Sequence, residues 1–188
     1  MNQSLLDRGL DALGLAGSGE LARRLERYIA AIETWNPAYG LVGASGEELV
    51  IKHILDSLAP LAVLDGLSVR ALADRPPALS GQTGELSLVD LGTGAGLPGI
   101  PLALARPTWG VRLVDRMTRR INFLKEMQTT LPLDNVEIVE EQVERYKGSH
   151  DIVTFRAFRP FERKLFRKVF AACAPGGFVA AYKGKADR

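Results

Sequence analysis

The segment from Val89 to Gly99 constrains the fold of this chain more than any other part of the sequence. A short, largely apolar run, Leu86 to Leu91, reads as a buried strand, and a turn rich in glycine follows it directly. The next residues, Ile100 to Leu104, have the apolar character of a helix start. Glycine at such a junction lets the backbone pass close to a bound ligand, where a side chain would collide with it. The segment therefore predicts a ligand-binding strand–turn–helix unit of an α/β fold.

The carboxylate of Asp90, at the end of the predicted strand, helps to decide which ligand this turn accepts. Dinucleotide folds use the turn to hold a pyrophosphate, which an acid would repel. The same acid would attract a cation, such as the amino group or the sulfonium of S-adenosylmethionine. Gly94, Gly96 and Gly99 also match G-x-G-x-x-G, but this match starts several residues beyond the strand. The turn thus indicates a methyltransferase, with nicotinamide binding and a turn that binds nothing as the alternatives.

Composition is compatible with one α/β domain and a short extra segment. The chain has 188 residues, of which 46% are hydrophobic and 24% are charged, and this is ordinary for a globular protein. The net charge of +2 does not itself indicate a nucleic-acid partner, although the pI of about 8.8 permits one. Cys173 is the only cysteine, which excludes an internal disulfide and a multi-cysteine zinc site; we expect no metal. The sequence shows no signal peptide and no apolar run long enough for a bilayer, so we expect a cytoplasmic protein.

The first part of the chain has helical patterns. Apolar residues from Leu21 to Trp35 recur at helical spacing, which predicts a helix with Ser18 as its N-cap. This helix should end near Asn36-Pro37, because the residue before a proline avoids helical geometry. Ser45 and Glu48 then have the spacing of a capping box and predict the start of a second helix.

A loop rich in proline and glycine, from Asp74 to Gly84, follows these helices. We therefore predict an N-terminal helical cap over residues 1–73, a linker over 74–84 and a methyltransferase domain over 85–188, which together form one compact unit.

Strands and helices alternate after the linker, which predicts a mostly parallel sheet flanked by helices, the Rossmann-like methyltransferase fold. The predicted strands are Leu86–Leu91, Val111–Val114, Val136–Val139, Ile152–Phe155 and Phe178–Tyr182; the predicted helices are Ile100–Arg106, Met117–Leu131 and Phe161–Ala172. Sheets of this kind normally end in an antiparallel hairpin after the fifth strand. This sequence stops at Arg188 without residues for the hairpin, so we expect either a truncated protein or a shortened sheet; an uncovered edge strand would favour association or instability.

Several segments, in order along the chain, resemble the RsmG family, also called glucose-inhibited division protein B. These segments are Trp35-Asn36, His53–Leu58, Asp90–Pro101, Val143-Glu144, Arg156–Phe158 and Lys183-Gly184. The resemblance implies a bacterial enzyme that uses S-adenosylmethionine to methylate N7 of one guanine in 16S ribosomal RNA. The cofactor-binding residues that follow from the motif and the resemblance are Asp90, Gly92, Thr93, Gly94, Gly96, Leu97, Asp115, Val143, Glu144 and Arg156.

Two acids after predicted strands have a ligand-binding interpretation and a plain one. Asp115 ends the second strand, where a carboxylate can accept hydrogen bonds from both ribose hydroxyls; the alternative is a solvated acid. Val143 and Glu144 match the family's contact with adenine, and the alternative for Glu144 is a charge on a solvated turn. Gln142 stands where the family often has arginine, which leaves the backbone contact intact.

Arg156 follows the fourth strand and is predicted at the mouth of the pocket. The resemblance implies that it contacts the cofactor and faces the target base, so we assign it a positioning role in catalysis. An ordinary exposed arginine is the alternative. His53 and Asp56 lie three residues apart on a helical face and are expected to form a structural pair; Lys183 is expected to meet a phosphate or solvent.

Basic residues gather at two predicted helix starts and after the last strand. The plain interpretation is a solvated basic face, and the alternative is a surface that follows RNA phosphates. The resemblance favours RNA. The candidate RNA-binding residues are Arg116, Arg119, Arg120, Arg163, Arg167 and Lys183.

The chemistry of N7 methylation needs few residues, because N7 carries a lone pair and no proton has to leave. Catalysis can then depend on proximity and alignment alone. Enzymes that methylate exocyclic amines commonly have Asn/Asp-Pro-Pro-aromatic after the fourth strand, whereas this chain has the segment Thr154–Phe158. Cys173 is expected to be a small core residue and not a nucleophile. Phe155 or Phe158 could stack on a base, but core packing is the default for both.

The expected partner is 16S ribosomal RNA, the small ribosomal subunit or an assembly intermediate, and the expected state is a monomer. Two other functions stay open from the sequence: a small-molecule methyltransferase, and an inactive scaffold that binds S-adenosylmethionine.

Overall fold

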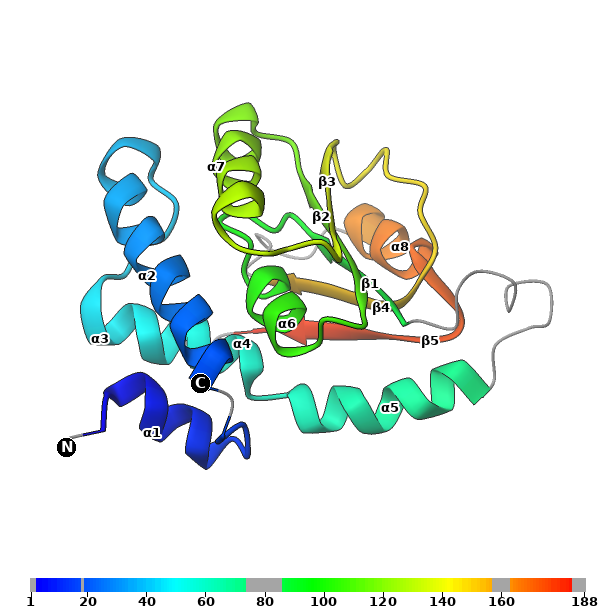
Figure 1. The fold of residues 1–188 in the computed structure, drawn as a ribbon. Helices are drawn as coiled ribbons and strands as arrows, with labels where there is room; N and C mark the ends of the chain where they lie inside the picture. Colours follow the sequence, from blue (N-terminus) through cyan, green and yellow to red (C-terminus); the bar gives the residue numbers. More distant parts are fainter. Residues whose placement is uncertain (1–2, 18, 74–85, 157–162, 184–188) are drawn as a thin grey trace, which may run out of the picture.

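The computed structural model describes residues 3–17, 19–73, 86–156 and 163–183. Its centre is a five-stranded sheet in the order β3-β2-β1-β4-β5, in which every neighbouring pair is parallel (Figure 1). The strands are β1 Ser87–Leu91, β2 Gly110–Asp115, β3 Val136–Glu140, β4 His150–Arg156 and β5 Cys173–Tyr182. All five predicted strands and the parallel sheet are confirmed.

β5 begins earlier than predicted, at Cys173 instead of Phe178. Its pairing with β4 is irregular, because Cys173 pairs with His150 but Phe178 already pairs with Ile152. The intervening residues include Gly177, where a Cβ atom would lie 2.7 Å from the carbonyl oxygen of Asp151. The strand is therefore extended through a glycine-containing bulge, which strand periodicity does not reveal.

The two faces of the sheet pack against different helices. Along β1, Leu88 belongs to the larger core cluster, whereas Val89 and Leu91 belong to a second cluster on the opposite face, as strand geometry requires. Helices α6 (Gly99–Ala105) and α7 (Thr118–Thr130) cover the Leu88 face. Helix α8 (Arg163–Ala171) covers the Val89 face through Val169. The three predicted helices are thus present, and residues 161–162 lie outside the described part of the chain.

The N-terminal part is helical, as predicted, and packs beside α6 and α7 (Figure 1). It contains α1 Leu5–Ala12, α2 Gly19–Tyr39, α3 Gly46–Leu49, the π-helix η1 Val50–Leu55, α4 Asp56–Leu58 and α5 Leu61–Ala73. Helices α1 and α5 were not predicted individually. Helix α1 carries a capping box in which Ser4 accepts from the backbone of Asp7 and the Asp7 side chain accepts from Ser4. The predicted linker and the N-cap Ser18 lie outside the described residues, so this domain boundary stays a prediction.

Helix α2 does not end at Asn36-Pro37, and this prediction is wrong. The helix continues to Tyr39 with Pro37 inside it. Proline removes only one backbone donor so near the end of the helix, and the N–H of Gly40 still reaches the carbonyl of Asn36. The side-chain oxygen of Asn36 then accepts from the N–H groups of Leu41 and Val42, at 2.7 and 2.9 Å. This side chain fixes the turn that leads towards the site.

The second predicted helix begins at Gly46, as expected, but the predicted capping box is not formed. Ser45 makes no side-chain cap. The N–H of Gly46 donates instead to Glu33 at 2.9 Å, and Glu48 pairs with Lys52 one turn further on. An acid on a neighbouring helix has replaced the local cap.

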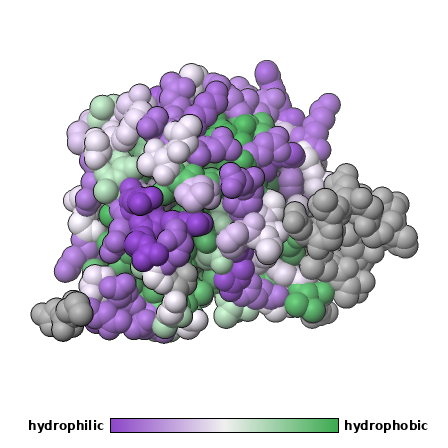
Figure 2. Space-filling view, in the orientation of Figure 1, coloured by the Kyte–Doolittle hydropathy of each residue, from purple (hydrophilic) through white to green (hydrophobic). Residues whose placement is uncertain are grey.

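The surface seen in Figure 2 is mostly hydrophilic, with hydrophobic atoms showing mainly between polar residues. Among the described residues, the exposed large hydrophobic side chains are Ile51, Val63, Val69 and Phe170. No helix in the described part of the chain is long and apolar enough to cross a membrane.

One buried hydroxyl joins the N-terminal helices to the glycine-rich turn. Tyr28 on α2 is fully buried, and its hydroxyl donates to the carbonyl oxygen of Ala95 at 2.6 Å. Burial raises the pKa of Tyr28 well above its usual value, so the hydroxyl stays protonated and remains a donor.

We expect Tyr28→Phe to lower the free energy of unfolding by about 1–2 kcal/mol, because it leaves the Ala95 carbonyl without its partner. Tyr39→Phe, the same change on the same helix, is the control and should cost much less, because the Tyr39 hydroxyl makes no hydrogen bond to any residue that the structure describes. Urea denaturation of the three proteins measures the difference. Equal stability of Tyr28→Phe and wild type would show that this bond does not hold the two parts together.

Candidate active site

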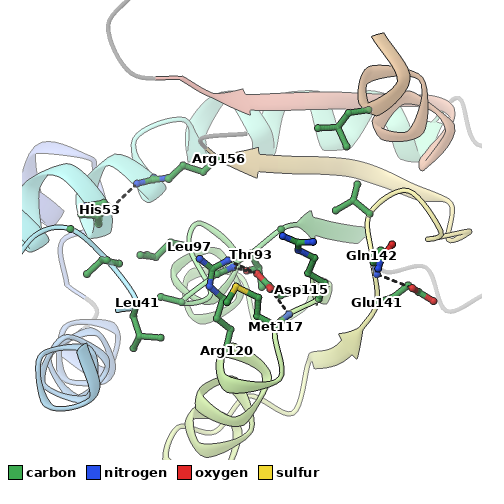
Figure 3. A pocket seen from close by; sticks show the side chains of 18 of the residues that line it. Leu41, His53, Thr93, Leu97, Asp115, Met117, Arg120, Glu141, Gln142 and Arg156 are labelled. Carbon is green, nitrogen blue, oxygen red and sulfur yellow. Dashed lines mark hydrogen bonds and ion pairs between the residues drawn. The ribbon is translucent and has the colours of Figure 1, made fainter. Parts of the chain in front are cut away.

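A cavity of about 840 Å³ lies at the carboxyl ends of the strands, where an α/β sheet of this type binds its ligand (Figure 3). Its walls come from segments far apart in the sequence: the turns after β1 and β2, the segment after β3, the end of β4, and two N-terminal segments. The lining residues are Leu41, Val42, Gly43, His53, Gly92, Thr93, Gly94, Ala95, Leu97, Asp115, Arg116, Met117, Arg120, Glu141, Gln142, Val143, Glu144, Arg156 and Leu165.

The turn after β1 forms the floor of the cavity with its backbone. Gly92, Gly94 and Gly96 have φ angles of 68°, 61° and 92°, a region that L side chains rarely adopt. The N–H of Gly92 donates to the carbonyl of Val114 on β2, which fastens the turn to the neighbouring strand. A Cβ atom at Gly99 would lie 2.2 Å from Leu113, so this glycine allows α6 to pack closely on the sheet. The glycines therefore serve both the shape of the turn and its packing.

Asp90 lies beneath this turn and does not line the cavity. Its carboxylate therefore does not face the space for a ligand, contrary to the prediction. It is fully buried and accepts hydrogen bonds from Thr93 Oγ1 at 2.6 Å, Gly99 N at 3.0 Å and Thr154 Oγ1 at 3.1 Å. Burial raises the pKa of Asp90 to about 6, although these hydrogen bonds oppose the shift. Asp90 is thus an internal anchor of the turn.

Asp115, at the end of β2, lines the cavity, unlike the strand-end acid Asp90. Its Oδ2 accepts from the N–H of Gly94 at 2.9 Å, and its Oδ1 accepts from the N–H of Met117 at 2.9 Å. Arg120 also reaches Oδ2, at 3.2 Å (Figure 3). This carboxylate therefore holds both the glycine turn and the start of α7, while Arg120 balances its charge at the edge of the cavity.

Arg120 is placed differently from what an RNA-facing residue requires. Its side chain is only 30% exposed and lies in the cavity wall, paired with Asp115. Its Nε atom is buried and has no partner among the described residues. Arg116 also lines the cavity but is exposed, and Arg119 is exposed outside the lining.

The segment after β3 brings Val143 and Glu144 to the cavity, together with Gln142 and Glu141 (Figure 3). The carboxylate of Glu141 accepts from the N–H of Gln142 at 2.8 Å, and this bond shapes the segment. Val143 also packs partly against the core cluster on the α8 side. The predicted position of these residues after the third strand is confirmed.

Arg156 lies at the cavity, as predicted, but its guanidinium is turned towards the N-terminal helices. Nη2 donates to Asp56 at 2.9 Å and to Ser57 Oγ at 3.1 Å. Nη1 donates to the Lys52 carbonyl at 3.1 Å and to His53 Nδ1 at 3.3 Å. The predicted His53–Asp56 pair is not observed, because both side chains contact Arg156 instead.

A ring from β5 supports this arginine. The guanidinium carbon lies 5.2 Å from the centre of the Tyr182 ring, and the Tyr182 hydroxyl donates to the Ser57 carbonyl at 2.9 Å. Arg156 and Tyr182 thereby connect the sheet to α4 and η1.

Several cavity residues were missed by the sequence analysis, namely Leu41, Val42, Gly43, Met117 and Leu165. Leu41 and its two neighbours belong to the turn that Asn36 organises, and no local pattern marks that turn as part of a site. Met117 follows Asp115 directly, so its place after a strand end could have indicated it.

The other candidates occupy varied positions. Phe155 is buried in the core, and Cys173 lies half-buried at the amino end of β5, where burial raises its pKa. Arg167 and Lys183 are exposed and lie outside the cavity lining. The side chain of Arg163 and all of Phe158 lie outside the described part of the structure. No group of three or more metal-ligating side chains occurs among the described residues.

Two solved structures described as methyltransferases have a similar fold, and the first is described as dependent on S-adenosylmethionine. One from Aquifex aeolicus has a TM-score of 0.52 at 16% identity, covering 81% of this chain and 71% of that one. A putative caffeoyl-CoA O-methyltransferase from Staphylococcus aureus has a TM-score of 0.50 at 14% identity, covering 81% and 65%. These likenesses show that the chain has the α/β fold of these methyltransferase structures.

The family can be stated more narrowly. A family model described as GidB, rRNA small subunit methyltransferase G, matches residues 21–188. Ribosomal RNA small subunit methyltransferase G of Bordetella avium is 34% identical over 185 residues, covering 96% of this chain and 75% of that protein. The protein of the same name from Nitrosomonas eutropha is 38% identical over 163 residues, covering 84% and 67%. The chain belongs to the rRNA small subunit methyltransferase G family.

The buried Asp90 makes the free energy of unfolding of the protein depend on pH. Its folded-state pKa of about 6 lies above the usual value, so between about pH 4 and pH 6 the folded state binds more protons than the unfolded state. Stability from this group is present at low pH and is lost as the pH rises. We expect the free energy of unfolding of wild type to fall by roughly 2 kcal/mol relative to Asp90→Asn between pH 4 and pH 7.

Urea denaturation across this pH range measures the difference, and Asp134→Asn, at an exposed acid, controls for the loss of one negative charge. A constant difference between wild type and Asp90→Asn would contradict this account of Asp90.

Proposed function

We propose that this chain transfers the methyl group of S-adenosylmethionine to N7 of a guanine in 16S ribosomal RNA. The observation that carries the proposal is the cavity itself. Within the region that matches the family, it joins the glycine turn, the Asp115 carboxylate and the Val143–Glu144 segment at the carboxyl ends of three strands. This is the position at which a parallel α/β sheet holds a nucleoside-containing cofactor.

The residues present fit S-adenosylmethionine in shape and in hydrogen-bonding groups. The backbone of Gly92 and Gly94 leaves room for the amino-acid end of the cofactor, because no side chain projects there. Asp115 would accept hydrogen bonds from the ribose hydroxyls, and Val143 and Glu144 would contact the adenine edge. Bound there, the cofactor would supply an activated methyl group on a sulfonium.

The protein's contribution to the reaction is to bind and align. The N7 atom of guanine has a free lone pair, so the site needs no general base. Phe155, directly after Thr154, is part of the core and is not placed to stack on a base. These features favour a ring nitrogen with a lone pair over an exocyclic amine as the methyl acceptor.

The basic side chains around the cavity suit an RNA substrate. Arg116 is exposed at the cavity and Arg119 is exposed on α7, so both are accessible to phosphate groups. We propose that the protein acts on the small subunit or on an assembly intermediate, as a monomer, in the cytoplasm.

A methyl-transfer assay tests the function directly. We expect the protein to transfer tritiated methyl groups from S-adenosylmethionine to under-methylated 30S particles, and mass spectrometry of the digested RNA should find the label as 7-methylguanosine. Asp115→Asn should weaken S-adenosylmethionine binding by about 10- to 100-fold in calorimetry, because charged hydrogen bonds are lost. Asp134→Asn, the same change at an exposed acid, should leave it unchanged.

Label on a different atom, or on a small molecule only, would contradict the proposed substrate. Binding of S-adenosylmethionine with no transfer to any RNA would identify an inactive scaffold.

The salt dependence of RNA binding tests the basic surface. Affinity for RNA falls as salt rises, and the loss of one phosphate contact should make the slope of log affinity against log salt less steep by about 0.7–0.9. We expect this change for Arg119→Ala. Lys125→Ala removes an exposed charge from the same helix and is the control. Filter binding with 16S RNA at several salt concentrations gives both slopes, and identical slopes for Arg119→Ala and wild type would exclude Arg119 from the RNA surface.

A further inference from the structure

The guanidinium of Arg156 has little capacity left for a substrate. Its two terminal nitrogens already donate to four acceptors, on Lys52, His53, Asp56 and Ser57. Its Nε atom is buried and has no partner among the described residues. The terminal N–H groups of this arginine are thus used in bonds to the N-terminal helices. A hydrogen-bond donor that faces the target base has to come from another residue.

His53 has such a donor. An arginine only donates, so the contact between Arg156 Nη1 and His53 Nδ1 makes Nδ1 an acceptor. A neutral imidazole with Nδ1 as acceptor carries its proton on Nε2. His53 lines the cavity, and its Nε2 has no hydrogen-bond partner among the described residues (Figure 3). The cavity therefore has a neutral N–H donor beside Arg156, at the end of β4.

We propose that His53 selects guanine as the methyl acceptor by donating its Nε2–H to the guanine O6 atom. This inference rests on the proposed function. Guanine has O6, an acceptor, beside N7, whereas adenine has an amino donor at that position. A donor from the protein would pair with O6 and leave the N7 lone pair free. Facing adenine, the same donor would meet another donor, and both would stay unpaired at a cost.

The surroundings of His53 keep its ring neutral. Burial and the charge of Arg156 lower the pKa of His53, with Lys52 adding to this effect, while Asp56 and Glu48 oppose it. A neutral ring does not repel a cationic methyl donor, and it also tolerates the positive charge that N7 methylation gives to the base. A neutral His53 ring is therefore compatible with the cationic methyl donor before transfer and with the positively charged base after it.

Arg156 acts through His53 and is a positioning residue. From the end of β4 it fixes the tautomer and the orientation of the His53 ring. The ring and the Lys52 carbonyl belong to the π-helical segment Val50–Leu55, and both accept from this one guanidinium. Single π-helical turns within α-helices frequently occur at functional sites. Here the segment brings a side chain of the N-terminal helices to the reaction centre of the sheet.

The test combines variants of His53 with RNA in which the target base lacks the O6 atom. The target guanine is first located by mapping the label that wild type transfers. RNA is then prepared with guanine or 2-aminopurine at that position, since 2-aminopurine keeps N7 and lacks O6. Initial rates give kcat/KM for wild type, His53→Leu, which removes the donor, and His53→Gln, which keeps a side-chain N–H donor.

For guanine, we expect His53→Leu to lower kcat/KM by about 10- to 100-fold and His53→Gln to recover part of this loss. For wild type, replacing the guanine by 2-aminopurine should lower kcat/KM by a similar factor. For His53→Leu, the same replacement should lower kcat/KM no further. Calorimetry should give unchanged affinity of His53→Leu for S-adenosylmethionine.

Equal penalties for 2-aminopurine in wild type and His53→Leu would overturn the proposal. Equal kcat/KM of wild type for guanine and 2-aminopurine would also overturn it. This second result does not depend on whether a variant folds. Failure of wild type to methylate any guanine would instead refute the proposed function, so the two failures are distinguishable.

Discussion

The rest of the site depends on how the Asp90 carboxylate holds the glycine turn from beneath. Thr93 and Gly99 donate to one of its oxygens and Thr154 donates to the other, so a single buried group fixes the turn, the start of α6 and the neighbouring strand β4. Ionised carboxylate is costly in such a place, which is why its pKa rises to about 6. The benefit is a turn whose backbone keeps one shape while it forms the floor of a cavity.

Long-range contacts then complete the cavity from the N-terminal side. Tyr28 holds the turn from α2, and Arg156 holds η1 and α4 from β4. Both contacts join a polar group of one part to a polar group of the other, so they fix the relative orientation more closely than apolar packing alone. In this way the N-terminal helices contribute His53 and the residues around Leu41 to a site that the sheet begins.

Much of the fold could be predicted from the sequence because it follows from local patterns. The five strands, the three helices that alternate with them and the two N-terminal helices that begin near Leu21 and Gly46 were indicated by apolar periodicity, turn residues and capping patterns. The glycine turn predicted where the cavity lies. What failed depended on tertiary contacts. Asp90 and Asp115 are both acids at strand ends, and only packing makes one of them an internal anchor and the other a cavity residue. The position of Arg120 depends in the same way on its pairing with Asp115. The continuation of α2 through Pro37 depended on bonds around Asn36 that no spacing rule includes.

The central claim is that the backbone floor, with the Asp115 carboxylate bound to the N–H of Gly94 beside it, accepts a nucleoside cofactor that carries no pyrophosphate. Isothermal titration calorimetry of the wild-type protein with S-adenosylmethionine and, separately, with NADH tests it most directly. The account predicts saturable binding of S-adenosylmethionine at one site and no measurable heat with NADH, because the Gly94 N–H of the turn already donates to Asp115 and is not available to a pyrophosphate. Tight binding of NADH without binding of S-adenosylmethionine would contradict it.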